Sequence, residues 1–199
     1  MTRLILLRHG RTAWNLIGRF QGQLDVDLDE VGVAQAEEAA HRVAAYEPDV
    51  IVASDLRRAA RTAQPLGALL GKPVSHDPRL RERFFGSWQG LTITEIQEKY
   101  PDDAERWARN EALVEPTIES LPVMVERVTE ALLDIAARVG DGGTAVVVTH
   151  GGAARSGCFG LLGWPEATWN TLGVLGNCRL TELRHNPKIG WQMRAYNAA

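Results

Sequence analysis

The 199-residue sequence predicts an α/β fold, a three-layer α/β/α sandwich in which helices cover both faces of a mostly parallel sheet. Three apolar runs, at residues 4–7, 50–53 and 144–149, carry this prediction. Each has the length of a strand, and its continuous apolar character is typical of strands buried on both faces. Helical patterns alternate with these runs, as in parallel sheets. Because no linker, repeat or low-complexity segment interrupts the chain, we expect a single domain over 1–199.

The composition is that of an ordinary globular protein. Apolar residues make up 45% and charged residues 24% of the chain, and the net charge of −3 gives no sign of a nucleic-acid or membrane surface. No apolar run has the length of a membrane helix, and the N-terminus lacks a signal-peptide pattern. Cys158 and Cys178 form no disulfide framework, and the five histidines show no metal-ligand spacing. We therefore expect a cytoplasmic protein without metal or cofactor.

The first half of the chain contains two strand–helix units. Thr12 follows the first strand and is expected to cap a helix that begins near Ala13. Asp29 is expected to cap a helix over 30–46, which ends before Pro48. The apolar face of that helix is expected to contain Val31, Ala34, Val43 and Ala44.

The second unit begins with the strand at 49–54. Asp55 is expected to cap the following helix, which continues to about residue 70 and ends at Gly71. Val74 then begins a short edge strand. Residues 77–90 show no period and have a high charge density, so we expect a loop there.

In the second half, short helices are expected over 92–100 and 102–110, followed by a loop over 111–122. From residue 121 to 139, apolar residues recur at alternating steps of four and three, which predicts a long amphipathic helix. The strand at 144–149 and a helix through residue 162 come next. The tail over 172–196 alternates loosely and predicts two or three short strands.

Polar residues follow three of the predicted strands: Arg8-His9-Gly10, Ser54-Asp55 and His150-Gly151-Gly152. The carboxyl ends of parallel strands lie at one edge of a sheet, where ligands of α/β proteins bind, so we expect these segments to meet. An arginine beside a histidine at such an edge indicates an anion site with a group able to attack or to move a proton. Ordinary loop chemistry is the alternative for each segment alone.

Five motifs occur in the order found in one known family. They are Arg8-His9-Gly10 with Thr12 and Asn15; Gly18-Arg19-Phe20-Gln21-Gly22 with Asp25; Ser54 to Ala59 with Thr62 and Ala63; Leu80-Arg81-Glu82 with Gly86, Trp88 and Gly90; and Thr149 to Gly152. In these motifs the chain resembles the histidine phosphatase superfamily, which includes the cofactor-dependent phosphoglycerate mutases. The resemblance covers nearly the whole chain and implies a phosphoglycerate mutase-like fold.

The resemblance also implies roles for the motif residues. His9 corresponds to the nucleophile that forms a phosphohistidine, and Glu82 to the general acid and base. Arg8, Arg58 and His150 correspond to the groups that surround the phosphoryl oxygens, which explains why no metal signature is needed. The remaining donors of the phosphate site would be Asn15, Gln21 and the amides of Gly22 and Gly151.

Each assignment has a purely structural alternative. Glu82 lies between Arg81 and Arg83 and could form a surface ion pair. His150 could be a core histidine. Arginines on helices are usually solvated, and only the register with the family favours Arg58 over Arg57.

The acceptor of the phosphoryl group distinguishes phosphatases from mutases, because a mutase shields the phosphoenzyme from water. The interval from Arg83 to Thr149 is short compared with the mutases that the chain resembles, and the Gly86-Ser87-Trp88-Gln89-Gly90 segment is similar to the phosphatase branch. We therefore expect a metal-independent phosphatase. A phosphoglycerate mutase is the alternative, and a non-catalytic phosphate-binding regulator is the other class considered.

The substrate is expected to be a small phosphorylated metabolite, a sugar phosphate or a phosphoglycerate derivative. Residues 19–25 and the tail over 164–177 are similar to glucosyl-3-phosphoglycerate phosphatases of actinobacteria. Thr117 and Ile118 stand where relatives often have glycines, so this loop should be stiffer and differently shaped. A homodimer is a further expectation from the family.

Overall fold

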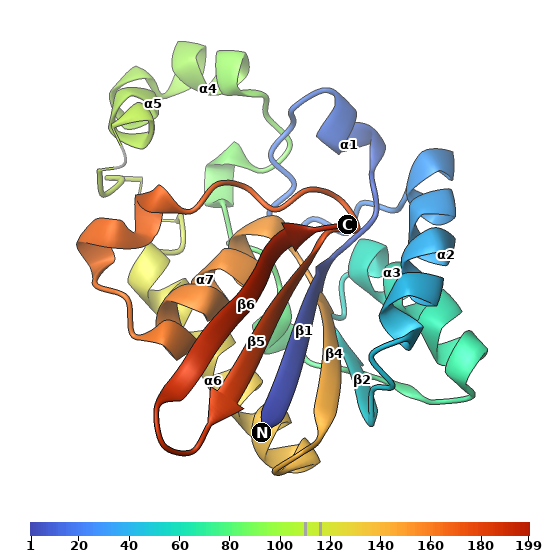
Figure 1. Cartoon of the computed structure of the whole chain (residues 1–199). Helices are drawn as coiled ribbons and strands as arrows, with labels where there is room; N and C mark the ends of the chain where they lie inside the picture. The colour runs from blue at the N-terminus through green and yellow to red at the C-terminus, as the bar shows by residue number, and fades with distance from the viewer. Residues whose placement is uncertain (110, 116) are drawn as a thin grey trace.

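The computed structural model describes residues 1–109, 111–115 and 117–199 and confirms the predicted α/β sandwich (Figure 1). Its strands are β1 Thr2–Arg8, β2 Val50–Ala53, β3 Val74–His76, β4 Thr144–Thr149, β5 Leu180–Asn186 and β6 Gly190–Ala198. They form one sheet in the order β3-β2-β4-β1-β5-β6. The pairs among β3, β2, β4 and β1 are parallel, whereas β5 and β6 continue the sheet antiparallel. The sheet is therefore mostly parallel, as predicted.

Helices cover both faces of the sheet, and two further helices lie beyond its edge (Figure 1). The helices are α1 Ala13–Leu16, α2 Glu30–Ala44, α3 Arg57–Leu70, α4 Ile93–Lys99, α5 Pro101–Ala108, α6 Leu121–Val139 and α7 Gly151–Leu162. Shorter 3₁₀ turns occur at Pro78–Leu80, Gly86–Trp88 and Glu166–Thr171. The bounds of α6, β4 and α7 agree with the sequence predictions. Asn110 and Pro116, which fall in a predicted helix and a predicted loop, lie outside the described residues.

Alternating side chains of the central strands supply the two layers of the core. Leu4 and Leu6 of β1 point to the face covered by α6 and α7, and Ile5 and Leu7 point to the face covered by α2 and α3. All are buried, with at most 2% of each residue exposed. Burying each such side chain contributes roughly 1.5–3 kcal/mol. Because β1 and β4 are covered on both sides, their carboxyl ends are held rigidly.

A separate aromatic cluster supports the loops above the sheet. Trp88 is fully buried and lies edge to face against Phe20 and Trp107. Ile96, Ala104 and Ile118 complete the buried part of this cluster. It joins α4 and α5 to the loop at 78–90, and that loop carries Glu82.

The predicted apolar face of α2 is wrong in part. Val31 and Ala34 are exposed, and the buried residues are instead Gly32, Ala36, Ala39, Ala40 and Val43. The reason is the contact of Gly32 with the loop after β1. A Cβ atom on Gly32 would lie 2.0 Å from the carbonyl oxygen of Arg11, so only glycine allows this approach. That contact fixes the rotation of α2 and turns Val31 toward solvent.

The expected cap of α3 is also wrong. Asp55 does not cap the helix, because its carboxylate forms an ion pair with Arg81. The Oδ1 atom of Asp25 instead accepts a hydrogen bond from the backbone N–H of Arg57 over 2.7 Å. A residue distant in sequence thus satisfies one of the free N–H groups at the start of α3. Thr12 and Asp29 cap their helices as expected, and Thr92 caps α4.

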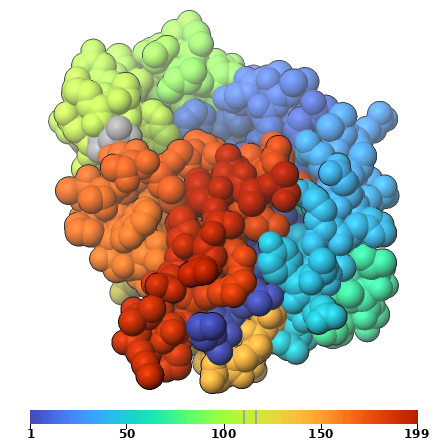
Figure 2. Space-filling model, viewed as in Figure 1, coloured from blue at the N-terminus to red at the C-terminus, as the bar shows by residue number. Residues whose placement is uncertain are grey.

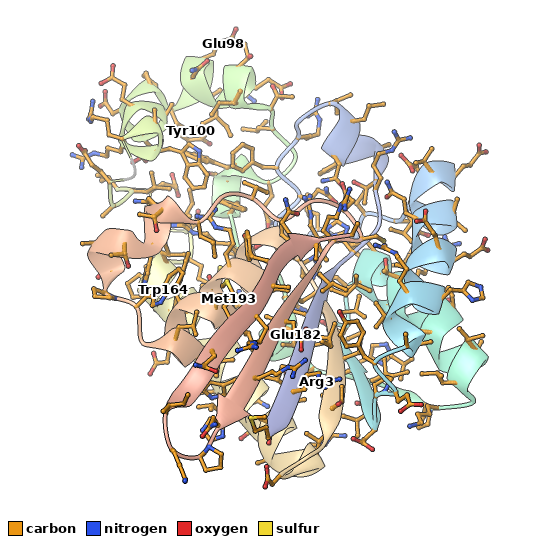
Figure 3. The ribbon with its side chains drawn as sticks, viewed as in Figure 1. Arg3, Glu98, Tyr100, Trp164, Glu182 and Met193 are labelled. Atoms are coloured by element: carbon orange, nitrogen blue, oxygen red, sulfur yellow. The ribbon has the colours of Figure 1, made fainter. Side chains whose placement is uncertain are left out.

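The tail forms two strands, β5 and β6, and residues of the C-terminal part of the chain cover part of the face shown in Figure 2. Glu182 of β5 lies beside Arg3 of β1, with their charged atoms 3.6 Å apart (Figure 3). This pair links the antiparallel hairpin to the central strand. Among the helices of the described residues, none combines the length and the apolar character that a membrane span requires.

Candidate active site

The polar segments that follow β1, β4 and β2 meet at one edge of the sheet. Arg8 and Thr149 are register partners at the ends of β1 and β4, and Ala53 of β2 pairs with Val148. His9 and His150 follow directly, and their ring centroids lie 5.2 Å apart in an edge-on arrangement. The convergence expected from the parallel topology is therefore present.

His9 is held in a single tautomer. Its Nδ1 atom lies 2.7 Å from the carbonyl oxygen of Gly10, and because a carbonyl only accepts, Nδ1 carries the proton and donates. The lone pair is then on Nε2. Burial and the positive charges of Arg58 and Arg8 hold the pKa of His9 well below its ordinary value. A neutral imidazole with a free Nε2 lone pair is a competent nucleophile.

His150 is fully buried and has both ring nitrogens engaged. Its Nδ1 accepts a hydrogen bond from Nε of Arg58 over 3.2 Å, and Nε2 lies 2.9 Å from Oγ of Ser54. Because Arg58 can only donate, Nε2 carries the proton and donates to Ser54. Burial and the charge of Arg58 lower the pKa of His150 well below its usual range.

Arg58 links three segments of the site. Only 1% of the Arg58 surface is exposed. Its terminal nitrogens donate to the carbonyl oxygens of Gly22 and Leu24 over 2.7 and 2.8 Å. Burial lowers the pKa of Arg58 to about 10, so the guanidinium remains charged near pH 7. Gly22 adopts a φ of +52° and approaches Gln89 too closely for a Cβ atom. Arg57, by contrast, is exposed, as the register with the family implies.

Arg8 is a second cation at the edge of the sheet and is partly buried. One terminal nitrogen donates to the carbonyl of Leu175, whereas its buried Nε has no hydrogen-bond partner among the described residues. Burial lowers the pKa of Arg8, and the charge of Glu82 opposes this shift in part. Gly151, the first residue of α7, lies so close that a Cβ atom there would be 3.4 Å from Nε of Arg8. The N-terminus of α7, which has no side-chain cap, therefore adds its positive dipole end to the two guanidinium groups.

Glu82 is oriented by backbone groups and is not a surface ion pair. Its Oε1 accepts from the N–H of Arg83 over 2.8 Å and its Oε2 from the N–H of Gly152 over 2.9 Å. Arg81 pairs with Asp55 instead. The charge of Glu82 acts on both Arg8 and Arg58, so the carboxylate lies near the cationic part of the site.

The expected oxygen-binding residues have different surroundings. Asn15 uses its Oδ1 atom to accept from the N–H of Thr12 over 3.0 Å, and thus belongs to the cap of α1. Gln21 is 8% exposed, and its Oε1 has no partner among the described residues.

Asn177 was not identified from the sequence, yet its amide donates to the carbonyl of His9 and to Oδ1 of Asn15. It connects the tail to the loop that carries His9.

Arg127 is the second residue that the sequence analysis missed. From α6 it donates to the carbonyl oxygens of Arg79, Arg81 and Glu82, and it pairs with both carboxylate oxygens of Glu119. It thereby holds the backbone of the loop that presents Glu82. The sequence contains a signal for this role. Arg127 lies one helical turn from Met124 and Ala131 on the apolar face of the predicted helix, where a charged residue is unusual.

Comparisons with known proteins agree with this geometry. The model of the histidine phosphatase superfamily (branch 1) matches residues 4–199. A glucosyl-3-phosphoglycerate phosphatase of Mycolicibacterium vanbaalenii is 40% identical, with 99% of this chain and 95% of that protein covered. A metal-independent phosphoserine phosphatase of Arabidopsis thaliana is 39% identical over 78% of this chain and 67% of its own.

A solved structure extends the comparison to three dimensions. It is that of a mycobacterial glucosyl-3-phosphoglycerate phosphatase complexed with VO3, and it superimposes with a TM-score of 0.92. The two sequences are 37% identical, and the match covers 99% of each chain. The similarity therefore includes the sheet, the helices and the loops that carry the site.

Proposed function

The chain belongs to branch 1 of the histidine phosphatase superfamily and is a phosphatase, and from this premise we propose how its residues hydrolyse a phosphomonoester. The observation that carries the proposal is the hydrogen bond from Nδ1 of His9 to the carbonyl of Gly10, which leaves the Nε2 lone pair free. Arg8 and Arg58 lie on the same side of the sheet edge and supply positive charge for the phosphoryl oxygens.

In the first step, Nε2 of His9 attacks phosphorus and the bond between phosphorus and the ester oxygen breaks. Glu82, protonated at the start of this step, gives its proton to the leaving oxygen, so an alcohol departs and a phosphohistidine remains. We assign the neutralisation of the equatorial oxygens to Arg8 and Arg58, with further donors from Asn15, Gln21, Gly22 and the Gly151 amide. His150 becomes a donor to phosphate only if its Nε2–H leaves Ser54.

In the second step, the Glu82 carboxylate takes a proton from water while the water oxygen attacks phosphorus. The bond between phosphorus and Nε2 breaks, and inorganic phosphate and a neutral His9 are released. The two backbone N–H groups that bind Glu82 support this role, because they fix the direction of the carboxylate throughout the cycle.

We further propose that the substrate is a phosphoglycerate derivative, with glucosyl-3-phosphoglycerate the first to be tested. The names of the most similar relatives support this choice. Phosphoserine is the second, since phosphoserine phosphatases are also among the relatives and one that matches 99% of the chain is 30% identical. A cytoplasmic location and a homodimer stay predictions.

The direct test is hydrolysis of p-nitrophenyl phosphate, with capture of an acid-labile phosphoenzyme. We expect His9→Ala to abolish both signals, because no other imidazole nitrogen at the site has a free lone pair in the described structure. His41→Ala, which changes an exposed histidine, is the matched control. Normal labelling of the His9 variant would refute the proposed nucleophile, and absence of wild-type turnover would favour a phosphate-binding regulator.

A second assay distinguishes hydrolysis from mutase activity. Incubation with 3-phosphoglycerate and bisphosphoglycerate should release inorganic phosphate if water is the acceptor. Rapid conversion to 2-phosphoglycerate without phosphate release would instead assign the chain to the mutases. In the same assays, Glu82→Gln should slow alkyl phosphates far more than p-nitrophenyl phosphate, whose leaving group needs little protonation.

A further inference from the structure

A cavity of about 480 Å³ opens beside Glu82 on the side of α7. Four aromatic residues line it: Phe85 comes from the loop that carries Glu82, Trp107 comes from α5, and the rings of Phe159 and Trp169 stack on each other with centroids 5.6 Å apart. Trp164, labelled in Figure 3, lies next to Phe159. Since Glu82 lines the cavity, the part of a substrate that it protonates would enter this space.

One face of α7 contributes the polar groups of the cavity. Arg155 and Ser156 each lie three or four residues from both Gly152 and Phe159, so the four residues share a side of the helix, and all four line the cavity. Gly152 also donates its N–H to Glu82. Arg155 therefore lies about one helical turn from the proposed general acid.

Two polar atoms on this face lack partners among the described residues. The buried Nε of Arg155 has none, although the guanidinium donates from another nitrogen to the carbonyl of Trp169 and lies over the Phe159 ring. Ser156 is fully buried, and its Oγ also has no partner. Buried polar groups are normally satisfied, so unpartnered donors in a cavity indicate a ligand with acceptor oxygens.

Arg83 adds a second cation to the cavity. Its Nε donates to the carbonyl of Glu119 over 2.6 Å, and its guanidinium lies between the rings of Phe85 and Trp107, 5.5 and 5.6 Å from their centroids. These contacts fix the guanidinium beside Glu82, the preceding residue. Two guanidinium groups near the acid favour an anion on the leaving group.

The charge of that anion is limited by the carboxylates nearby. Glu111 and Glu166 line the cavity as well, and both are exposed; Glu111 pairs with Arg109. With Glu82 they disfavour a dianion such as a second phosphate. A carboxylate has one charge and two acceptor oxygens, and it matches the fork of an arginine.

We propose that Arg155 and Arg83, with Ser156, form a carboxylate site that selects leaving groups carrying a carboxylate close to the ester oxygen. This inference rests on the proposed phosphatase function. The aromatic walls beyond this site have room for a ring that stacks on Trp107 or Trp169, while Glu111 and Glu166 can accept hydrogen bonds from its hydroxyls. The favoured substrate class is therefore a phosphorylated hydroxy acid, with or without a sugar on it.

The test compares 3-phosphoglycerate with glycerol 3-phosphate, which differ in whether a carboxylate or a hydroxymethyl group ends the chain. We expect the wild-type enzyme to favour 3-phosphoglycerate in kcat/KM. Arg155→Gln should reduce the ratio of the two kcat/KM values by about 10- to 100-fold, the effect of losing a hydrogen bond to a charged group. Ser156→Ala, which removes only a hydroxyl group, should reduce the ratio by about 2- to 10-fold.

Arg138→Gln is the matched control, because Arg138 is exposed on α6 and does not line the cavity. The ratio should stay at the wild-type value in this variant. An unchanged ratio in both Arg155→Gln and Ser156→Ala would overturn the carboxylate site, as would a wild-type enzyme without preference. If Arg155→Gln does not fold, Ser156→Ala and Arg155→Lys test the carboxylate site instead. Because lysine keeps the positive charge, Arg155→Lys should retain part of the wild-type preference for 3-phosphoglycerate.

A binding experiment separates this inference from the proposed function. Calorimetry with the His9→Ala variant measures the affinities for 3-phosphoglycerate and glycerol 3-phosphate without turnover. Tighter binding of 3-phosphoglycerate that is lost in His9→Ala/Arg155→Gln would support the carboxylate site even if the chain proves inactive. Hydrolysis of p-nitrophenyl phosphate together with equal affinities for both ligands would overturn the site and leave the phosphatase function intact.

Discussion

The Nε atom of Arg58 donates to Nδ1 of His150 over 3.2 Å, so a permanent cation fixes the tautomer of a buried imidazole. The same guanidinium disfavours a proton on His9. Both histidines are therefore neutral near pH 7, for the common reason that they lie buried beside arginines. A neutral His9 suits the nucleophilic attack that we propose, and neutral His150 accepts a hydrogen bond from Arg58.

The first prediction concerns stability at acidic pH. The unfolded chain protonates His9 and His150 near pH 6.5, whereas the folded chain resists protonation because the pKa values of both are lowered. The unfolded state then binds more protons, and stability is lost as pH falls below about 6.5. Between pH 6.5 and 5.5 we expect each histidine to lower the free energy of unfolding by about 1 kcal/mol. Urea unfolding of wild type and His150→Gln at pH 6.5 and pH 5.5 measures this loss. If the free energy of unfolding depends equally on pH in both proteins, His150 does not contribute as predicted.

The second prediction concerns the position of Glu82. A Cβ atom on Gly152 would lie 2.3 Å from Oε1 of Glu82, so Gly152→Ala must displace the carboxylate. The helix itself should tolerate alanine, which has the higher helix propensity. We expect kcat/KM for alkyl phosphates to fall by about 10²-fold, within the range for loss of general acid catalysis, with a much smaller effect on p-nitrophenyl phosphate. Gly173→Ala is the control, since nothing lies within 4 Å of its Cβ position. Equal losses for both substrates would argue against displacement of the acid.

The third prediction concerns Arg127 as a positioning residue. Lysine keeps the charge but cannot reach all three loop carbonyls and the Glu119 carboxylate at once. Arg127→Lys should lower the free energy of unfolding by about 1–3 kcal/mol, because buried acceptors lose their donor. It should also lower the ratio of alkyl to aryl phosphate turnover, as we expect for Glu82→Gln. Arg138→Lys, an exposed position on the same helix, is the control, and a stability loss without any change in this ratio would assign Arg127 a structural role alone.

The fourth prediction tests the distant cap of α3. Asp25→Ala removes the acceptor of the Arg57 N–H and should reduce stability by about 1 kcal/mol. Asp25→Asn should be close to wild type, because asparagine is an equally good N-cap. Thermal or urea unfolding of the two variants provides the comparison. Similar destabilisation by both would mean that the ion pair with Arg57 matters more than the cap.

The sequence was informative where the chemistry is local. The apolar runs of β1 and β4 and the four-three period of α6 depend on neighbouring residues alone, and the structure agrees with them. The meeting of His9 with His150 followed from the rule that parallel strands end at a common edge. The choice of Arg58 over Arg57 needed the family resemblance, because both arginines begin the same helix.

Features made by contacts between distant segments could not be predicted. Asp25 caps a helix that begins 32 residues later, and nothing near Asp55 shows that Arg81 takes its carboxylate. The rotation of α2 depends on the close approach of Gly32 to Arg11, which no periodicity of apolar residues encodes. The cavity beside Glu82 likewise combines residues of the loops, α6 and α7 that share no motif.

The incompletely paired guanidinium of Arg8 affects the outcome of any selection for variants with higher thermal stability. Removing part of a cation from water is unfavourable, and the buried Nε atom of Arg8 recovers no hydrogen bond within the described residues. Methionine at this position would fill similar space without that penalty, at the loss of an anion-binding group. Screening variants for heat resistance alone would therefore select against the arginine that we propose to bind phosphate at position 8. Including phosphate in the screen would reverse that bias, because a ligand of the folded state stabilises only the chains that bind it.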